Sequence, residues 1–112
     1  MPWIQIGCFL ALAAVAAGAF GAHALKSHLS AARLETFEIA VRYQMYHAIA
    51  TVLAGILRVD AAGWCFTVGI AIFSGSLYAL CLTEARWLGA ITPLGGVLFL
   101  VGWLIIVLSS KT

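Results

Sequence analysis

The side chains that could do chemistry are concentrated in one stretch of the 112-residue chain. Glu35, Glu38 and Arg42 follow one another at helical spacing, and Tyr46 and His47 come about one turn later. Steps of three or four residues place side chains on one face of a helix, and a glutamate four residues before an arginine has the orientation that favours an ion pair. Such a set could line a binding site, form a partner interface or relay a proton.

A second side of the same predicted helix indicates a close-packing seam that holds one imidazole. Two interpretations of each feature stay open. Glu38 and Arg42 form either an interfacial ladder, with Arg42 reaching toward lipid headgroups, or a buried pair at a site. His47 makes either a hydrogen bond between helices or a functional contact with a proton, ligand or metal. The seam comprises Ala40, Tyr43, His47, Ala50, Thr51 and Ala54.

Other parts of the chain place polar residues in the same half of the predicted structure. His23 lies near the end of the first apolar run, and Ser74 and Tyr78 share a helical stripe in the third. Haem bound between His23 and His47, at comparable depth on two helices, is an open alternative; otherwise we expect no cofactor or metal. The candidate binding or interface residues are His23, Glu38, Arg42, Tyr43, Tyr46, His47, Ser74 and Tyr78.

The elements that must position these residues are long apolar runs. Hydrophobic residues make up 64% of the chain and charged residues 9%, against roughly 25% charged in soluble domains. The runs cover residues 3–25, 37–57, 61–82 and 87–109, each near the roughly 20 residues that a membrane-crossing helix needs. Only helices or closed barrels span lipid. The sequence therefore predicts an all-α integral membrane protein, a four-transmembrane-helix antiparallel bundle forming one domain over residues 1–112.

The ends and links of these runs bear on orientation. No basic segment precedes the first run, which also exceeds the apolar part of a signal peptide, so we expect a retained span. The links after the first and third runs carry Lys26, Arg33 and Arg86, against Arg58 and Lys111 on the other side. The positive-inside rule thus favours both termini outside. The tryptophans near the span ends are predicted to be interfacial anchors.

Several chemical signatures are missing from the sequence. It contains no phosphate-binding glycine loop, no HExxH, no GxSxG and no carboxylate dyad, so we expect no enzymatic activity. Cys8, Cys65 and Cys81 have neither CxxC spacing nor a nearby histidine at a metal-ligand interval. We expect them to be small buried hydrophobic residues, and we expect no nucleic-acid partner.

Five short blocks resemble the signature of a family of small membrane proteins of unknown function, which includes the bacterial inner-membrane protein YgdD and the eukaryotic transmembrane-256 proteins. The resemblance implies a four-span protein of the bacterial plasma membrane or, in a eukaryote, of a mitochondrial membrane. It implies no catalytic residue and no substrate. The blocks are residues 18–25 (GAFGAHAL), 43–48 (YQMYHA), 73–78 (FSGSLY), 91–96 (ITPLGG) and 102–103 (GW).

These observations favour an accessory, assembly or stabilising subunit that packs against a larger membrane complex. The pairs Ala14/Gly18 and Ala71/Gly75 have the small-xxx-small spacing that permits tight contact with a partner or a second copy. The alternative is a lipid-, quinone- or small-solute-binding protein with a pocket open to one leaflet. A transporter is disfavoured, because the polar residues reach only partway across the membrane.

Overall fold

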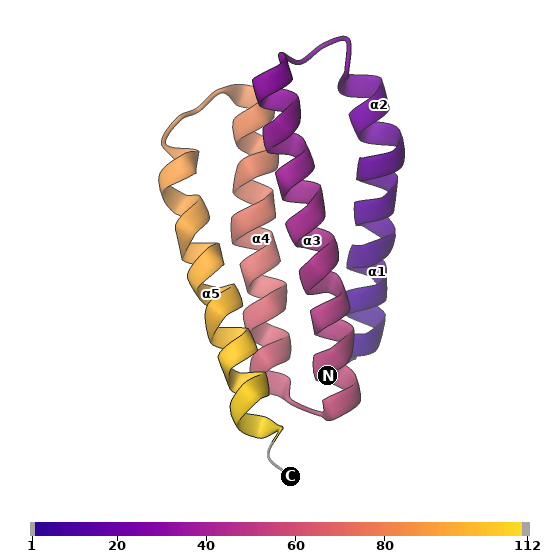
Figure 1. Cartoon of the computed structure of the whole chain (residues 1–112), viewed down its shortest axis with the longest axis vertical. Helices are drawn as coiled ribbons and strands as arrows, with labels where there is room; N and C mark the ends of the chain where they lie inside the picture. Colours follow the sequence, from indigo (N-terminus) through magenta and orange to yellow (C-terminus); the bar gives the residue numbers. More distant parts are fainter. Residues whose placement is uncertain (1, 111–112) are drawn as a thin grey trace.

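The computed structural model describes residues 2–110, which are helical apart from short links and contain no strand. The all-helical prediction is therefore confirmed for this part of the chain. A π-helical turn interrupts the first helix, so that its two parts carry separate labels (Figure 1). The elements are α1 (Trp3–Ala16), the π-helical turn (Ala17–Gly21), α2 (Ala22–Leu25), α3 (Ala31–Leu57), α4 (Asp60–Thr83) and α5 (Leu88–Ser109).

Local chemistry explains where the central helices begin and end. The Ser30 hydroxyl accepts a hydrogen bond from the Arg33 backbone N–H at 3.2 Å and caps the start of α3. The residues that follow α3 and α4, Arg58 and Glu84, cap the two helices with φ of 59° and 60°. This left-handed conformation commonly terminates helices, although glycine usually supplies it. The links are thus short, and neighbouring helices run antiparallel.

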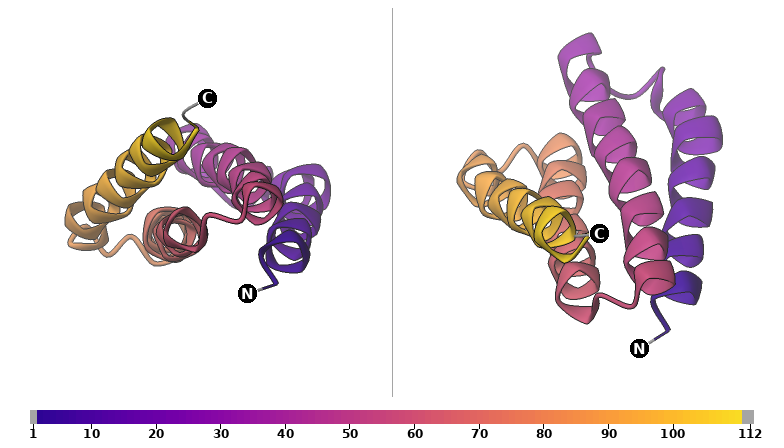
Figure 2. Two further views of the ribbon diagram at one scale, coloured as in Figure 1. Left: turned by 90° about the horizontal axis from the view of Figure 1, so that it is seen from below. Right: turned by 60° about the horizontal axis from the view of Figure 1, so that its bottom comes forward.

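The helices lie in an open arc in the order α1, α3, α4, α5 (Figure 2). α4 packs along both α3 and α5, and α1 packs mainly on α3. α1 and α5 are the outer helices of an arrangement that measures 50 × 27 × 20 Å. In the most apolar window of the Trp3–Leu25 segment only 11% of residues are buried. The first helix therefore leaves most of its surface uncovered by this chain.

Glycines allow the helices to approach closely where they pack. A Cβ on Gly7 of α1 would lie 2.6 Å from the Ala48 carbonyl oxygen of α3. At the contact of α4 with α5, a Cβ on Gly95 would lie 2.5 Å from the Phe73 backbone nitrogen, and one on Gly102 would lie 2.5 Å from the Phe66 ring. Backbones can meet at these distances only where a side chain is absent.

One predicted small-residue pair does not mediate such a contact within the chain. Ala71 is exposed, and a Cβ on Gly75 would meet nothing within 4 Å. The contact of α4 with α5 uses Gly69 instead, because the helix turns that face toward Phe99. Ala71 and Gly75 consequently lie on the outer surface of α4.

Three helical segments of the described chain are long and apolar enough to cross a membrane: Trp3–Leu25, Asp60–Thr83 and Leu88–Ser109. They match three of the four predicted spans closely. α3 is not among them, because Arg42, Gln44 and His47 lie in its more apolar part. α3 thus differs from the neighbouring helices in carrying several polar residues along its apolar part.

The two adjacent glycines of α5 test the close contact with α4. We expect Gly95→Ala to destabilise the protein by about 1–3 kcal/mol, because the new methyl group would overlap backbone atoms of α4. Gly96→Ala is the matched control: its Cβ would have only an ordinary 3.9 Å contact with the Phe73 ring, so stability should stay the same or rise by up to about 1 kcal/mol. Unfolding followed by circular dichroism in detergent measures both. Equal stability of the two variants would contradict the packing described.

Candidate functional site

The Gln44 side chain joins three helices in the interior. Its Oε1 accepts a hydrogen bond from the Tyr78 hydroxyl of α4 at 2.6 Å, and its Nε2 donates to the Leu10 carbonyl of α1 at 2.8 Å. Gln44 is buried, with 6% of its surface exposed. A buried amide is costly unless both its ends are bonded. This arrangement satisfies the amide and ties α1 and α4 to opposite sides of α3.

His47 is the second polar link, between α3 and α5. Its Nδ1 lies 2.8 Å from the Tyr43 carbonyl oxygen, and its Nε2 lies 3.1 Å from the Trp103 indole nitrogen. A carbonyl only accepts and an indole N–H only donates. The ring must therefore be neutral, with its proton on Nδ1. It also stacks on Phe99, with centroids 3.6 Å apart. The prediction of an interhelical hydrogen bond is confirmed.

This geometry bears on ligand binding by the histidines. The Nε2 lone pair of His47 is occupied by Trp103, so a metal or haem iron would have to displace that bond. His23 is exposed and follows Gly21, which faces Phe37. His47 lies ten residues farther along α3, which is about 15 Å of helix. The prediction that the two imidazoles lie at comparable depth is wrong, because His23 lies two residues before the end of α2, whereas His47 lies sixteen residues after the start of α3.

Hydroxyl groups complete the contacts between helices. Ser74 of α4 donates to the Ala40 carbonyl of α3 at 2.7 Å. Ser76 of α4 bonds Thr92 of α5 at 2.5 Å. Among the described residues, the only buried side-chain polar atom without a partner is the Thr67 hydroxyl. The predicted candidates Ser74, Tyr78 and His47 thus hold helices together.

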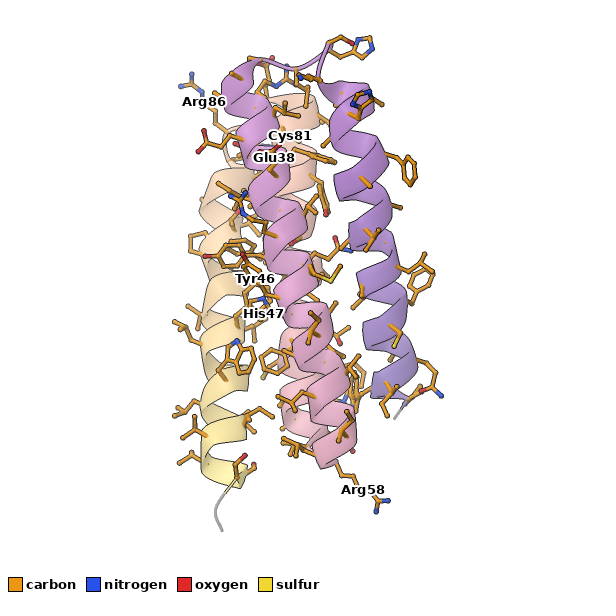
Figure 3. All side chains as sticks on the ribbon, turned by 45° about the vertical axis from the view of Figure 1, so that its right-hand side comes forward. Glu38, Tyr46, His47, Arg58, Cys81 and Arg86 are labelled. Carbon is orange, nitrogen blue, oxygen red and sulfur yellow. The ribbon has the colours of Figure 1, made fainter. Side chains whose placement is uncertain are left out.

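Three charged residues of α3, Glu35, Glu38 and Arg42, lie on its outside, whereas Arg33 is half-buried and donates to the Cys81 carbonyl of α4 at 2.8 Å. Glu38, Arg42 and Tyr46 are all exposed, and Glu38 and Tyr46 lie about two turns apart along α3 (Figure 3). The predicted ion pair of Glu38 with Arg42 does not form: within residues 2–110 the only pair within 4 Å joins Arg33 to Glu84, at 3.9 Å. Glu38 and Arg42 are instead both exposed, which agrees with the interfacial interpretation.

Tyr43 connects this outer face to the interior. Its ring lies 4.7 Å from Phe73 and 5.7 Å from Tyr46, and 38% of its surface is exposed. Aromatic pairs at such separations attract one another. We call Glu38, Arg42, Tyr43 and Tyr46 the α3 outer face. The predicted candidates therefore divide into this outer face, the buried links and His23.

A shallow apolar depression of about 510 Å³ lies on the outer side of the first helix. None of the predicted candidate residues lines it. Cys8 does, and its exposure shows that the prediction of a buried residue is wrong for it; α1 has a neighbour on one side only, so this face stays uncovered. Cys81 is buried as predicted, and all three cysteines are free. The lining residues are Cys8, Ala11, Leu12, Val15, Ala16 and Phe20.

Sequence reasoning missed the roles of Gln44, Trp103 and Trp3. Gln44 carried a usable signal, since an amide within an apolar helix usually bonds a neighbouring helix. Trp3 is not an interfacial anchor: it is 2% exposed, and its indole donates to Asp60 at 2.8 Å. No local pattern indicates that bond, because the two residues lie 57 positions apart.

Comparison with known proteins places the chain among bacterial membrane proteins. The family described as "Protein of unknown function (DUF423)" matches residues 17–96. A UPF0382 membrane protein of Staphylococcus saprophyticus is 48% identical over 96% of this chain and 95% of its own length. The UPF0382 membrane protein YwdK of Bacillus subtilis is 45% identical over 96% of this chain and 94% of its own. These similarities and the apolar helices support a bacterial membrane location. No solved structure matches the chain.

A double-mutant cycle tests the Gln44 link. We expect Gln44→Leu and Tyr78→Phe each to lower stability, and their effects to be coupled by about 0.5–1.5 kcal/mol, because either change removes the same hydrogen bond. Tyr46→Phe is the control, since the Tyr46 hydroxyl makes no hydrogen bond to any described residue. Unfolding free energies in detergent measure the coupling. Additive effects would show that the bond does not contribute.

Proposed function

Since the chain belongs to the DUF423 family of bacterial UPF0382 membrane proteins, we propose that it is a non-catalytic accessory subunit that packs against a larger membrane complex. The observation that carries this proposal is the use of the interior polar groups. Gln44, His47 and Ser74 bond helices of the same chain rather than facing a shared cavity. The surfaces free to act are therefore external.

We propose that α3 is the fourth crossing of an antiparallel membrane bundle. It packs between α1 and α4, which are both apolar enough to cross. With Arg58 at one boundary, the rise of about 1.5 Å per residue puts Glu38 about 30 Å away, the thickness of the hydrocarbon core. Arg42 then lies about 6 Å inside, within reach of the headgroups. Arg58 and Glu38 indeed lie toward opposite ends of the structure (Figure 3).

The outer side of α1 is the proposed docking surface for the partner. Three of the six residues that line the depression are small, Cys8, Ala11 and Ala16, and Phe20 stands out from it with 75% of its surface exposed. Small residues allow another helix to approach closely. The neighbouring π-helical turn at Ala17–Gly21 is a feature that often accompanies functional sites.

The alternative of a ligand pocket within the bundle has less support. Its predicted residues divide between two environments: His47 and Tyr78 are engaged in interior bonds, whereas Arg42 and Tyr46 are on the surface. These residues therefore do not converge on one pocket.

The crossing of α3 can be tested by labelling single cysteines. We expect a cysteine at position 35 of a variant without native cysteines to react with a membrane-impermeant maleimide, and one at position 49 to remain unreactive until detergent is added. Position 35 lies beyond the proposed boundary, while Ile49 lies about 13 Å from Arg58, well inside the membrane. Vesicles of both orientations cover either topology. Labelling of both positions in intact vesicles would contradict the crossing.

The docking surface can be tested by filling the depression. We expect affinity-tagged protein, extracted in mild detergent, to bring down a stoichiometric membrane protein, and Ala16→Trp to lose it. Leu100→Trp on the exposed side of α5 is the control and should retain the partner. Quantitative mass spectrometry of the eluates gives the ratio. Repeated recovery of the wild-type protein alone would contradict an accessory role, and equal recovery with both variants would contradict the docking surface.

A further inference from the structure

We propose that the α3 outer face binds a phospholipid whose headgroup ends in a primary ammonium group, as in phosphatidylethanolamine. The proposal rests on the membrane crossing of α3 described above and is independent of the accessory role. It concerns Glu38, Arg42, Tyr43 and Tyr46, and it uses no group of the interior hydrogen-bond network.

The order of groups along α3 matches the order of groups in such a lipid. Glu38 lies at the proposed boundary, Arg42 follows about 6 Å deeper, and Tyr46 about 6 Å deeper again. In phosphatidylethanolamine the ammonium is outermost, the phosphate lies beneath it, and the glycerol and acyl chains follow. Each charged group of the helix therefore faces a lipid group of opposite charge.

The two charged side chains are available for this contact. Both are exposed, and within the described chain neither belongs to an ion pair. A charge near the hydrocarbon boundary is costly unless it finds a partner. The guanidinium group can bind phosphate oxygens through two parallel hydrogen bonds, which are among the stronger contacts available to it. The Glu38 carboxylate can accept from an ammonium group.

The tyrosines supply the surface beneath the headgroup. Tyr46 is 53% exposed, and Tyr43 lies against it while resting on Phe73. Tyrosine suits this depth because its ring is apolar and its hydroxyl is polar. Because the Tyr43 ring packs against Phe73, the surface formed by the two tyrosine rings is in place before a lipid binds.

The Glu38 carboxylate makes the proposed site selective for phosphatidylethanolamine over other phospholipids. Next to Glu38, an anionic headgroup such as phosphatidylglycerol loses part of its attraction to Arg42 through like-charge repulsion. The quaternary ammonium of phosphatidylcholine has no N–H to donate. Phosphatidylethanolamine alone of the three satisfies both side chains.

Native mass spectrometry of the purified full-length protein tests the site. Each of the three lipids is added in turn, and we expect wild-type protein to bind phosphatidylethanolamine roughly tenfold more tightly than the other two. Arg42→Gln should weaken the binding of phosphatidylethanolamine and phosphatidylglycerol by roughly tenfold. Arg42→Lys, which keeps the charge but loses the planar fork, should fall between.

Glu38→Gln should change the affinities for two of the lipids in opposite directions. It should weaken phosphatidylethanolamine binding but strengthen phosphatidylglycerol binding, because the repulsive carboxylate is gone. The controls are Glu84→Gln and Arg86→Gln, which make the same charge changes at exposed positions at the same end of the structure. Both should bind lipids as wild type does.

Two results would overturn the proposal. One is equal affinity of the wild-type protein for phosphatidylethanolamine and phosphatidylglycerol. The other is an Arg42→Gln variant that binds as the Arg86→Gln control does. Failure of the crossing itself appears separately, as maleimide labelling at position 49, and would also remove the lipid site. Loss of the lipid preference with correct labelling would refute the lipid site and leave the accessory role untouched.

Discussion

Polar groups inside the helix assembly must bond one another, because a membrane offers them no other partner. Gln44 shows how strongly this requirement shapes the structure. Its amide accepts a hydrogen bond from Tyr78 and donates one to a carbonyl of α1, so one side chain sets the relative heights of three helices. His47 and Trp103 do the same for α5. Glycines then bring the backbones close enough for these short bonds to form.

The sequence indicates the helices well, because each is defined by local features. The apolar runs predicted the bounds of three segments within a few residues. The two sides of α3 were also separable from its periodicity, with the charged side exposed and the His47 side buried except for Tyr43, which is exposed. Spacing along one helix carries this information without knowledge of its neighbours.

Contacts between distant residues were beyond the sequence. Cys8 and Trp3 are both apolar residues near the start of one helix, yet the first is exposed and the second buried, because only one side of α1 has a neighbour. The Glu38–Arg42 spacing favours an ion pair, but a pair on a surface gains little free energy and need not form. The open arc of helices determines which of the predicted site residues lie close together, and no local sequence pattern indicates that arrangement.

The two helix ends with a left-handed backbone conformation also fix the depth of the protein in the membrane. Arg58 and Glu84 each accept an unfavourable backbone conformation of about 1 kcal/mol where glycine would accept it freely. In return each tight turn holds a charge at the point where a helix stops. α4 is therefore bounded by Arg58 and Asp60 at one end and by Glu84 and Arg86 at the other. Moving α4 along the membrane normal in either direction would bring a charge into the hydrocarbon core. The charges at its two ends therefore set the depth of α4 in the membrane, and the other helices are hydrogen-bonded to it directly or through α3.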